Sequence, residues 1–135
     1  STTGAAQAVA KALPELDGLL TGNAIRVPTP NVSMAIMNLN LKNATNKEEL
    51  NDYMRQISLN SKLQNQIDYT ASNEIVSTDL VGSRSAGVLD SQATIVVDDR
   101  AVLYVWYDNE FGYSCQVVRV MHEMAGIHVP ALPAT

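Results

Sequence analysis

The stretch AVLYVWYDNEFGYS, residues 101–114, decides the fold of this chain. Residues 101–107 are mostly β-branched and aromatic and contain no proline, which predicts a strand that is covered on both faces. Asp108, Asn109 and Glu110 then place polar side chains where the strand ends, a position that often carries ligand-binding groups. From the spacing alone, a plain strand-to-helix connection with solvated polar residues is favoured.

The residues just before this stretch predict a hairpin. Residues 93–97 are rich in strand-forming side chains and lead into the 101–107 strand through a short polar turn. The turn contains the adjacent acids Asp98 and Asp99, a pair that can suggest metal binding. Without other ligands nearby, solvated turn residues are favoured, and we predict no metal site.

The residues just after the stretch predict a final helix. Apolar residues at helical spacing run from Gly112 to about residue 125, and Gly126 ends the pattern. Cys115 lies near the start of this helix, where a thiol can be activated. Local structure brings neither His122 nor His128 beside it, so a structural cysteine is favoured over a nucleophile.

The beginning of the chain predicts a short helix with an exposed start. Residues 5–13 are rich in alanine and are followed by Pro14, which ends the helix. The unpaired N–H groups at such a helix start can bind an anion. Ordinary capping by Thr2 or Thr3 is favoured on local sequence alone.

The next residues predict two strands. Residues 23–27 form a short strand that the PTP sequence ends, with Arg26 on the face opposite its apolar neighbours. That face is either solvated or a pocket in which the guanidinium binds phosphate or carboxylate. Residues 32–42 alternate apolar and polar side chains, which predicts a strand with one wet face in an antiparallel sheet.

The middle of the chain predicts one helix and a long polar region. Thr45 and Glu48 have capping-box spacing, and the apolar stripe through EELNDYMRQI predicts a helix that covers a sheet face. Residues 58–87 read as loops, with extended pieces at residues 67–70 and 75–80.

Composition limits the class of protein. The 135 residues, 46% hydrophobic and 17% charged, fit a single globular domain. A net charge of −5 with nine scattered basic residues argues against nucleic-acid binding. One cysteine and the lack of any membrane-length apolar run or signal sequence lead us to expect a cytoplasmic protein. A chain that starts at Ser1, directly before a helix, is typical of a piece of a longer protein.

Five motifs in order resemble the catalytic domain of phosphorylating glyceraldehyde-3-phosphate dehydrogenases: STTGAAQAV, LPELDG, NAIRVPTP, IVSTDLVGS and WYDNEFGYS. Single motifs of this length are weak, but their common order across nearly the whole chain is specific. The resemblance covers residues 1–125, and residues 126–135 form an extended tail. It implies an α+β domain with a mixed, mostly antiparallel sheet and helices packed on one face.

The resemblance also implies site residues. Thr3 and Gly4 match the TGAA positions and Arg26 matches the RVP position, which bind phosphate in the family. A helix start and a guanidinium would then converge on one anion. Asn109 matches the asparagine that contacts the nicotinamide carboxamide, and its amide offers both a donor and an acceptor. Neighbouring family positions that support the site fall on Tyr107, Glu110 and Tyr113.

The same resemblance implies that parts of the active site lie elsewhere. The family's cysteine nucleophile, which forms a thiohemiacetal, its histidine base and its Rossmann domain are expected upstream of Ser1. Cys115 does not match the nucleophile, so we expect no catalytic residue in this chain, which would be inactive alone. The full protein would use NAD or NADP, a sugar phosphate and inorganic phosphate, and would form a tetramer.

Two alternatives stay open at this stage. Phe111 stands where the family often has tryptophan, which together with the tail suggests a divergent subfamily and leaves erythrose-4-phosphate as a possible substrate. The second alternative is a noncatalytic assembly or interaction module, using sheet surfaces that the family employs for tetramer contacts.

Overall fold

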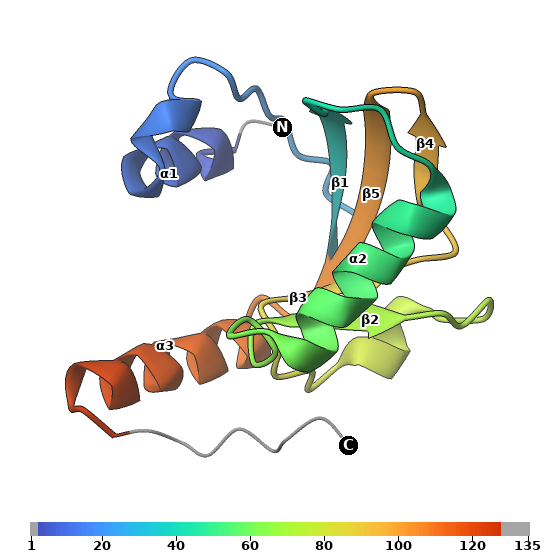
Figure 1. Cartoon of the computed structure of the whole chain (residues 1–135). Coiled ribbons are helices and arrows are strands. Elements are labelled where there is room, and N and C mark those ends of the chain that lie inside the picture. Colours follow the sequence, from blue (N-terminus) through green and yellow to red (C-terminus); the bar gives the residue numbers. More distant parts are fainter. Residues whose placement is uncertain (1–2, 128–135) are drawn as a thin grey trace. The chain divides into compact units, whose positions relative to one another are not determined.

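A computed structural model describes residues 3–127 of the chain, which divides into two compact units, Ser1–Pro30 and Asn31–Thr135 (Figure 1). The expectations for Thr2, for His128 and for the tail from residue 128 onward lie outside the described residues.

The first unit contains two short helices and a long irregular segment. Helix α1 spans Ala5–Ala12, and the 3₁₀-helix η1 spans Pro14–Leu16. Proline ends α1 as expected, because it lacks an N–H and clashes with the preceding turn. The strand predicted at residues 23–27 is wrong: this segment has no regular structure and none of the described residues pairs with it.

The second unit is built on a five-stranded sheet with two α-helices. Its elements, in chain order, are β1 (Ser33–Asn40), α2 (Lys47–Asn60), β2 (Ile67–Thr70), η2 (Ser77–Leu80), β3 (Gly87–Asp90), β4 (Ile95–Val97), β5 (Arg100–Tyr107) and α3 (Phe111–Met124). Among the described residues, none of these helices combines the length and the hydropathy that crossing a bilayer requires.

Strand β5 organises the sheet because three other strands pair with it. It is antiparallel to β1 along its whole length, to β4 near its beginning and to β3 near its end. Strand β2 then pairs with β3 in parallel, which gives the order β1-β5-β3-β2 with β4 as a hairpin partner of β5. The predicted α+β class with a mixed, mostly antiparallel sheet is therefore confirmed.

The core of the second unit lies where β5 and β3 meet. Its buried apolar side chains are Val32, Val88, Leu89, Ala101 and Leu103. On β5 the buried positions Ala101 and Leu103 alternate with half-buried neighbours, as the period of a strand requires. The expectation that β5 is covered on both faces is thus met on one face and only partly on the other.

Helix α2 packs against the sheet next to β2 and crosses it in Figure 1. The stripe predicted for this helix is half-buried, with Leu50, Met54 and Ile57 inward. The capping residue differs from the prediction by one position. Asn46 in extended backbone conformation accepts a hydrogen bond from the Glu49 N–H at 2.9 Å, because asparagine there has the better N-cap geometry.

The region between α2 and β4 differs most from expectation. Residues 67–70 are extended as predicted, whereas the 75–80 piece is a 3₁₀ turn, in which the Asp79 carboxylate accepts a hydrogen bond from the Val76 N–H. The central strand β3 was not predicted at all. Its apolar part is only two residues long, so it shows no period of its own.

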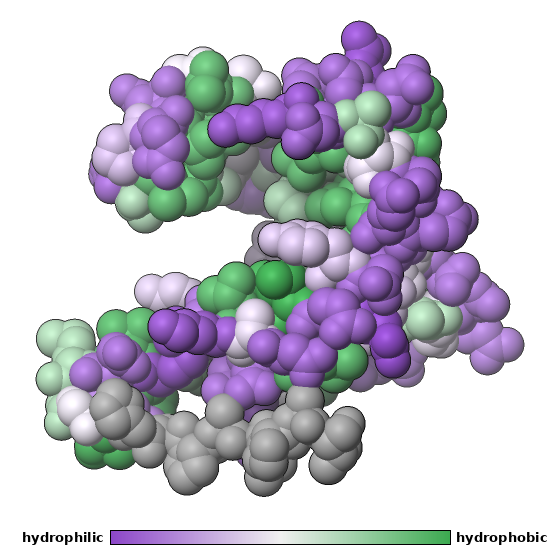
Figure 2. Space-filling view, viewed as in Figure 1, coloured by the Kyte–Doolittle hydropathy of each residue, from purple (hydrophilic) through white to green (hydrophobic). Residues whose placement is uncertain are grey.

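Helix α3 begins at the end of β5 and runs away from the sheet (Figure 1). Its start is anchored because the Gln116 side chain donates hydrogen bonds to the backbone carbonyls of Asn65 and Arg84. Figure 2 shows hydrophobic patches among polar side chains on this helix. The exposed apolar residues there include Val117, Val118, Val120, Met121 and Met124.

Candidate functional site

The corner between β5 and α3 is held by one carboxylate. Helix α3 begins at Phe111, and its N-cap residue, Glu110, makes no capping hydrogen bond through its own side chain. Asp108 caps the helix instead, because its Oδ1 accepts hydrogen bonds from the N–H groups of Glu110 at 3.0 Å and Phe111 at 2.8 Å. The first free donors of the helix are therefore satisfied by the residue that follows the strand.

The same carboxylate also holds two other segments. Its Oδ2 accepts a hydrogen bond from the Gly82 N–H at 2.9 Å, and the side chain of Asn31 bonds to it as well. Asp108 is only 2% exposed. The hydrogen bonds, first that of Gly82 and then that of Phe111, lower the pKa of the Asp108 carboxyl from 3.8 to about 2, although burial acts in the opposite direction.

Asn109 follows directly and is exposed. Its Oδ1 accepts a hydrogen bond from the Ser33 hydroxyl at 3.4 Å, which is a long contact, across the register in which Ser33 faces Tyr107. The amide nitrogen of Asn109 donates no hydrogen bond to any acceptor within residues 3–127. The side chain therefore keeps an amide donor available to a ligand.

The three residues expected to support this site lie around Asn109 in the chain. Tyr107 is half-buried at the end of β5, and Glu110 is exposed. The Glu110 carbonyl accepts hydrogen bonds from the backbone and hydroxyl of Ser114. Tyr113 lies on the first turn of α3 and is 69% exposed. The structure thus gives Glu110 a role in the helix start and leaves Tyr113 accessible.

In the first unit, two of the residues expected to bind phosphate lie at the start of α1. Gly4 is the N-cap residue, and glycine has no side chain that could cap the helix. The Thr3 hydroxyl oxygen accepts a hydrogen bond from the Ala5 N–H at 3.3 Å, which is a long contact. Local capping by Thr3 is thus present, as local sequence favours, and it leaves most of the helix start accessible.

Arg26, the third of these residues, lies on the irregular segment of the same unit. This segment returns to the start of α1, because a Cβ atom on Gly22 would lie 3.5 Å from the Thr3 side chain. Arg26 itself is exposed, and its neighbours Ile25 and Val27 are 87% and 62% exposed. The structure brings the segment to the helix start, and within the described residues no hydrogen bond joins Arg26 to Thr3 or Gly4.

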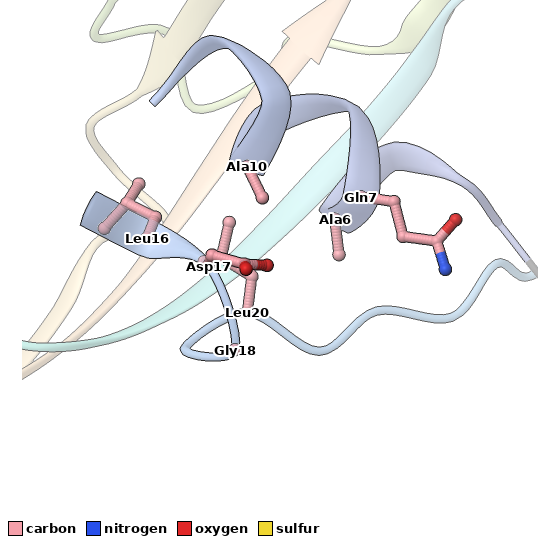
Figure 3. Close-up of a pocket in the computed structure, with 7 residues that line it drawn as sticks. All are labelled: Ala6, Gln7, Ala10, Leu16, Asp17, Gly18 and Leu20. Atoms are coloured by element: carbon pink, nitrogen blue, oxygen red, sulfur yellow. The ribbon is translucent and has the colours of Figure 1, made fainter. Parts of the chain in front are cut away.

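A small pocket of about 220 Å³ lies in the first unit, between α1 and the turn after η1 (Figure 3). It is lined by Ala6, Gln7, Ala10, Leu16, Asp17, Gly18 and Leu20. The Asp17 carboxylate disfavours an anion there, and none of the lining residues is one expected to bind phosphate. The pocket is therefore separate from the predicted phosphate residues.

Sequence reasoning missed the hydrogen bonds of Asp108, which hold the corner together and take no part in chemistry. Asp108 was noted only as one of three polar residues, and the roles of Gly82 and Asn31 were not seen. One local signal could have pointed to Asp108, since an aspartate two and three residues before free helix N–H groups is a common cap. No local signal connects Asp108 to residues so distant in the sequence.

Comparison with known proteins places this arrangement in a class, a domain of dehydrogenases. The family model described as "Glyceraldehyde 3-phosphate dehydrogenase, C-terminal domain" matches residues 1–109. The chain belongs to this family.

Individual relatives agree with this assignment. A glyceraldehyde-3-phosphate dehydrogenase-like protein of Pseudomonas aeruginosa (strain UCBPP-PA14) is 70% identical over 97% of this chain and 28% of the relative. Glyceraldehyde-3-phosphate dehydrogenase 2 of Mucor circinelloides f. lusitanicus is 42% identical over 97% of this chain and 38% of its own length. The cytosolic enzyme of Ginkgo biloba is 41% identical over 93% and 36%, respectively. The chain thus spans about a third of the length of these relatives.

Proposed function

We propose that this chain supplies the C-terminal part of the catalytic domain of a longer oxidoreductase, which oxidises glyceraldehyde-3-phosphate with NAD or NADP and inorganic phosphate. The observation that carries the proposal is the presentation of Asn109. It stands exposed on a hydrogen-bonded corner, at the position where the family contacts nicotinamide, with its amide nitrogen available.

The chemistry of this corner fits a carboxamide. A ligand amide needs both a donor and an acceptor, and Asn109 provides its amide nitrogen together with the remaining lone pair of Oδ1. When bound, the nicotinamide ring accepts a hydride from the substrate. Asn109 would orient the ring by holding its carboxamide, and the exposed Tyr113 and half-buried Tyr107 would flank it.

Phosphate binding is assigned to Thr3, Gly4 and Arg26. The accessible start of α1 offers N–H groups to an anion, and the segment that carries Arg26 returns to this start at Gly22. A guanidinium adds charge-assisted hydrogen bonds that suit a phosphate group. The ligand would be the phosphate of the sugar or inorganic phosphate.

The chain alone would be inactive. The nucleophilic cysteine, the histidine base and the Rossmann domain of the family would come from other parts of the full protein. Cys115 is half-buried in α3 and is not proposed as a substitute. The full protein would act as a tetramer in the cytoplasm.

The direct test uses the full-length protein that carries this chain. Purified protein is supplied with glyceraldehyde-3-phosphate, phosphate and either NAD or NADP, and formation of the reduced nicotinamide is followed by absorbance. Turnover that requires all three components would support the proposal. A folded tetramer without turnover on glyceraldehyde-3-phosphate or on erythrose-4-phosphate would contradict it.

Erythrose-4-phosphate is the alternative substrate to include, because Phe111 stands where the family often has tryptophan and suggests a divergent subfamily. Identity to the dehydrogenase-like protein is 70%, whereas identity to the two named dehydrogenases is 41–42%. The matched segment covers 28% of the dehydrogenase-like protein and 36–38% of the two named dehydrogenases. The dehydrogenase-like protein is therefore the longer one. This difference supports a divergent subfamily, and the ratio of kcat/KM for the two aldose phosphates decides the substrate.

A noncatalytic assembly module is the other candidate. The observation that favours it is the number of exposed apolar side chains, which include Val117 and Met121 on α3 and Ile36 and Met37 on β1. Size-exclusion chromatography of this chain alone tests the idea: a discrete oligomer supports it, and a strict monomer contradicts it.

A further inference from the structure

The Asp108 carboxylate lies where the start of α3 meets two segments that are distant in the sequence. Gly82 follows η2, Asn31 precedes β1, and Glu110 and Phe111 are the N-cap and the first residue of α3. Each segment bonds to this one side chain. A buried carboxylate is retained only where such donors compensate for its lost hydration, so this arrangement depends on the charge of Asp108.

The donors are fixed by the backbone and not by flexible side chains alone. Gly82 has φ +84°, a conformation that glycine adopts without strain, and this conformation accompanies the N–H directed at Oδ2. The N–H groups of Glu110 and Phe111 belong to the start of α3, whose dipole also favours a negative charge. The carboxylate therefore sits in a rigid set of donors.

This set of hydrogen bonds holds the backbone on both sides of Asn109. Its preceding residue is Asp108 itself, and the N–H of its following residue, Glu110, bonds to the same carboxylate. The turn of backbone that carries Asn109 is thus closed by a hydrogen bond across it. Small displacements of this turn would move the Asn109 amide directly.

The side chain of Asn109 is also connected to the Asp108 carboxylate through residues 31–33. Asn31 bonds to Asp108 and also accepts a hydrogen bond from the Val32 N–H, at 2.7 Å. Val32 is buried with φ +69°, which is an uncommon conformation for a β-branched residue and needs support from its surroundings. Ser33 comes next and donates to the Asn109 Oδ1.

We propose that Asp108 is a positioning residue for the nicotinamide cofactor, which acts by holding both the backbone of Asn109 and the segment that carries its side-chain partner Ser33. This inference rests on the proposed function of Asn109. Asp108 itself does not touch the cofactor. Its loss would weaken contacts to the nicotinamide and leave contacts to the rest of the cofactor unchanged.

The test compares NAD with ADP-ribose, which lacks the nicotinamide, as ligands of the full-length protein. Kd is measured by calorimetry for Asp108→Asn, Asn109→Ala and the double variant. We expect Asp108→Asn to raise the Kd of NAD about tenfold, since displaced binding groups lose much of their effect, and to change that of ADP-ribose by less than about twofold. In the Asn109→Ala background the same substitution should add less than about twofold, because its target is gone.

The controls separate this inference from the proposed function. Asp99→Asn, at an exposed position in the turn between β4 and β5, should change neither Kd. If Asn109→Ala leaves the Kd of NAD unchanged, the proposed role of Asn109 fails. If Asn109→Ala weakens NAD binding while Asp108→Asn does not, or does so equally for ADP-ribose, the positioning role alone fails.

A milder variant covers the case in which Asp108→Asn does not fold. Asn31→Ala removes one side-chain partner of Asp108 and the support of the Val32 N–H. We expect it to raise the Kd of NAD about threefold without a matching change for ADP-ribose. An unchanged Kd for NAD would overturn the proposal.

Discussion

The two regions proposed to bind ligands are built differently. At the β5–α3 corner, Asp108 is 2% exposed and accepts hydrogen bonds from three other segments of the second unit. At the start of α1, Thr3 makes one hydrogen bond of 3.3 Å, and Arg26 lies exposed on a segment without regular structure. The backbone that carries Asn109 would thus be held in advance by this chain, although the Asn109 side chain is exposed, whereas the segment that carries Arg26 would depend on ordering when the ligand binds.

This difference separates two kinds of mutational effect. Changes in the corner should disturb folding, because they leave buried groups unpaired or crowd the backbone. Changes near α1 should disturb ligand binding at little cost in stability, because the side chains there are exposed.

The largest loss of stability is expected from a substitution that adds a methyl group in the corner. In Gly112→Ala, the added Cβ would lie 2.8 Å from the Ser85 carbonyl oxygen and 3.1 Å from that of Ser83, and neither backbone group can move without shifting the loop. We expect the free energy of unfolding to fall by about 3 kcal/mol, measured by urea denaturation.

Gly4→Ala is the matched control from the other region. Its Cβ would meet nothing within 4 Å, and its φ of −87° suits alanine, so a change below about 0.5 kcal/mol is expected. Equal losses for the two variants would show that the corner is no more constrained than the start of α1.

The next effect in size concerns phosphate affinity. Arg26→Ala in the full-length protein should raise KM for the sugar phosphate or for inorganic phosphate by about 30-fold, which corresponds to about 2 kcal/mol for a lost charge-assisted pair. Thermal unfolding should be nearly unchanged. Arg55→Ala, an exposed position on α2, serves as control. An unchanged KM for both ligands would refute the role of Arg26.

The titration of Asp108 predicts how the stability of the fold depends on pH. Its folded-state pKa is lowered to about 2 from 3.8, so the carboxylate stabilises the fold above pH 3.8 and this contribution is lost as the pH falls toward 2. The difference in Tm between the wild-type protein and Asp108→Asn should therefore be full at neutral pH and disappear over this acid range. A difference that stays constant down to pH 2 would contradict the assignment.

The smallest effect is expected at Thr3. Thr3→Ala removes one exposed hydrogen bond that water can replace, so the free energy of unfolding should change by less than about 0.5 kcal/mol. KM for phosphate should nevertheless rise about threefold, if the hydroxyl contributes one neutral hydrogen bond to the ligand. Thr29→Ala on the same unit is a suitable comparison, and a similar rise in KM there would remove the specific role of Thr3.

Long, periodic segments could be predicted from the sequence. Strands β1 and β5 and helices α2 and α3 carry enough residues to show a period of two or of 3.6, and all four are found close to their expected bounds. Strand β3 is missing from the prediction because its burial comes from its neighbours β5 and β2 and not from its own pattern. The strand predicted at residues 23–27 failed for the converse reason, since extended residues become a strand only with a partner.

The site was predictable to a similar degree. Asn109 could be proposed because it belongs to a contiguous motif at the end of a predicted strand. The role of Asp108 could not, because Gly82 and Asn31 are far from it in sequence and reach it only in the folded chain. A contiguous motif is enough to propose a ligand-binding residue, whereas the contacts that hold it in place appear only in the tertiary structure.

The pairing of β1 with β5 also determines when this domain can form during synthesis. The register joins Asn40 to Arg100 and Ser33 to Tyr107, so β1 waits through at least sixty further residues before its partner leaves the ribosome. Until then the alternating apolar side chains of β1 have no strand to pair with, and contacts of such sequence separation form slowly. The nascent chain therefore carries an open, aggregation-prone strand while these intervening residues are made, a natural binding site for chaperones.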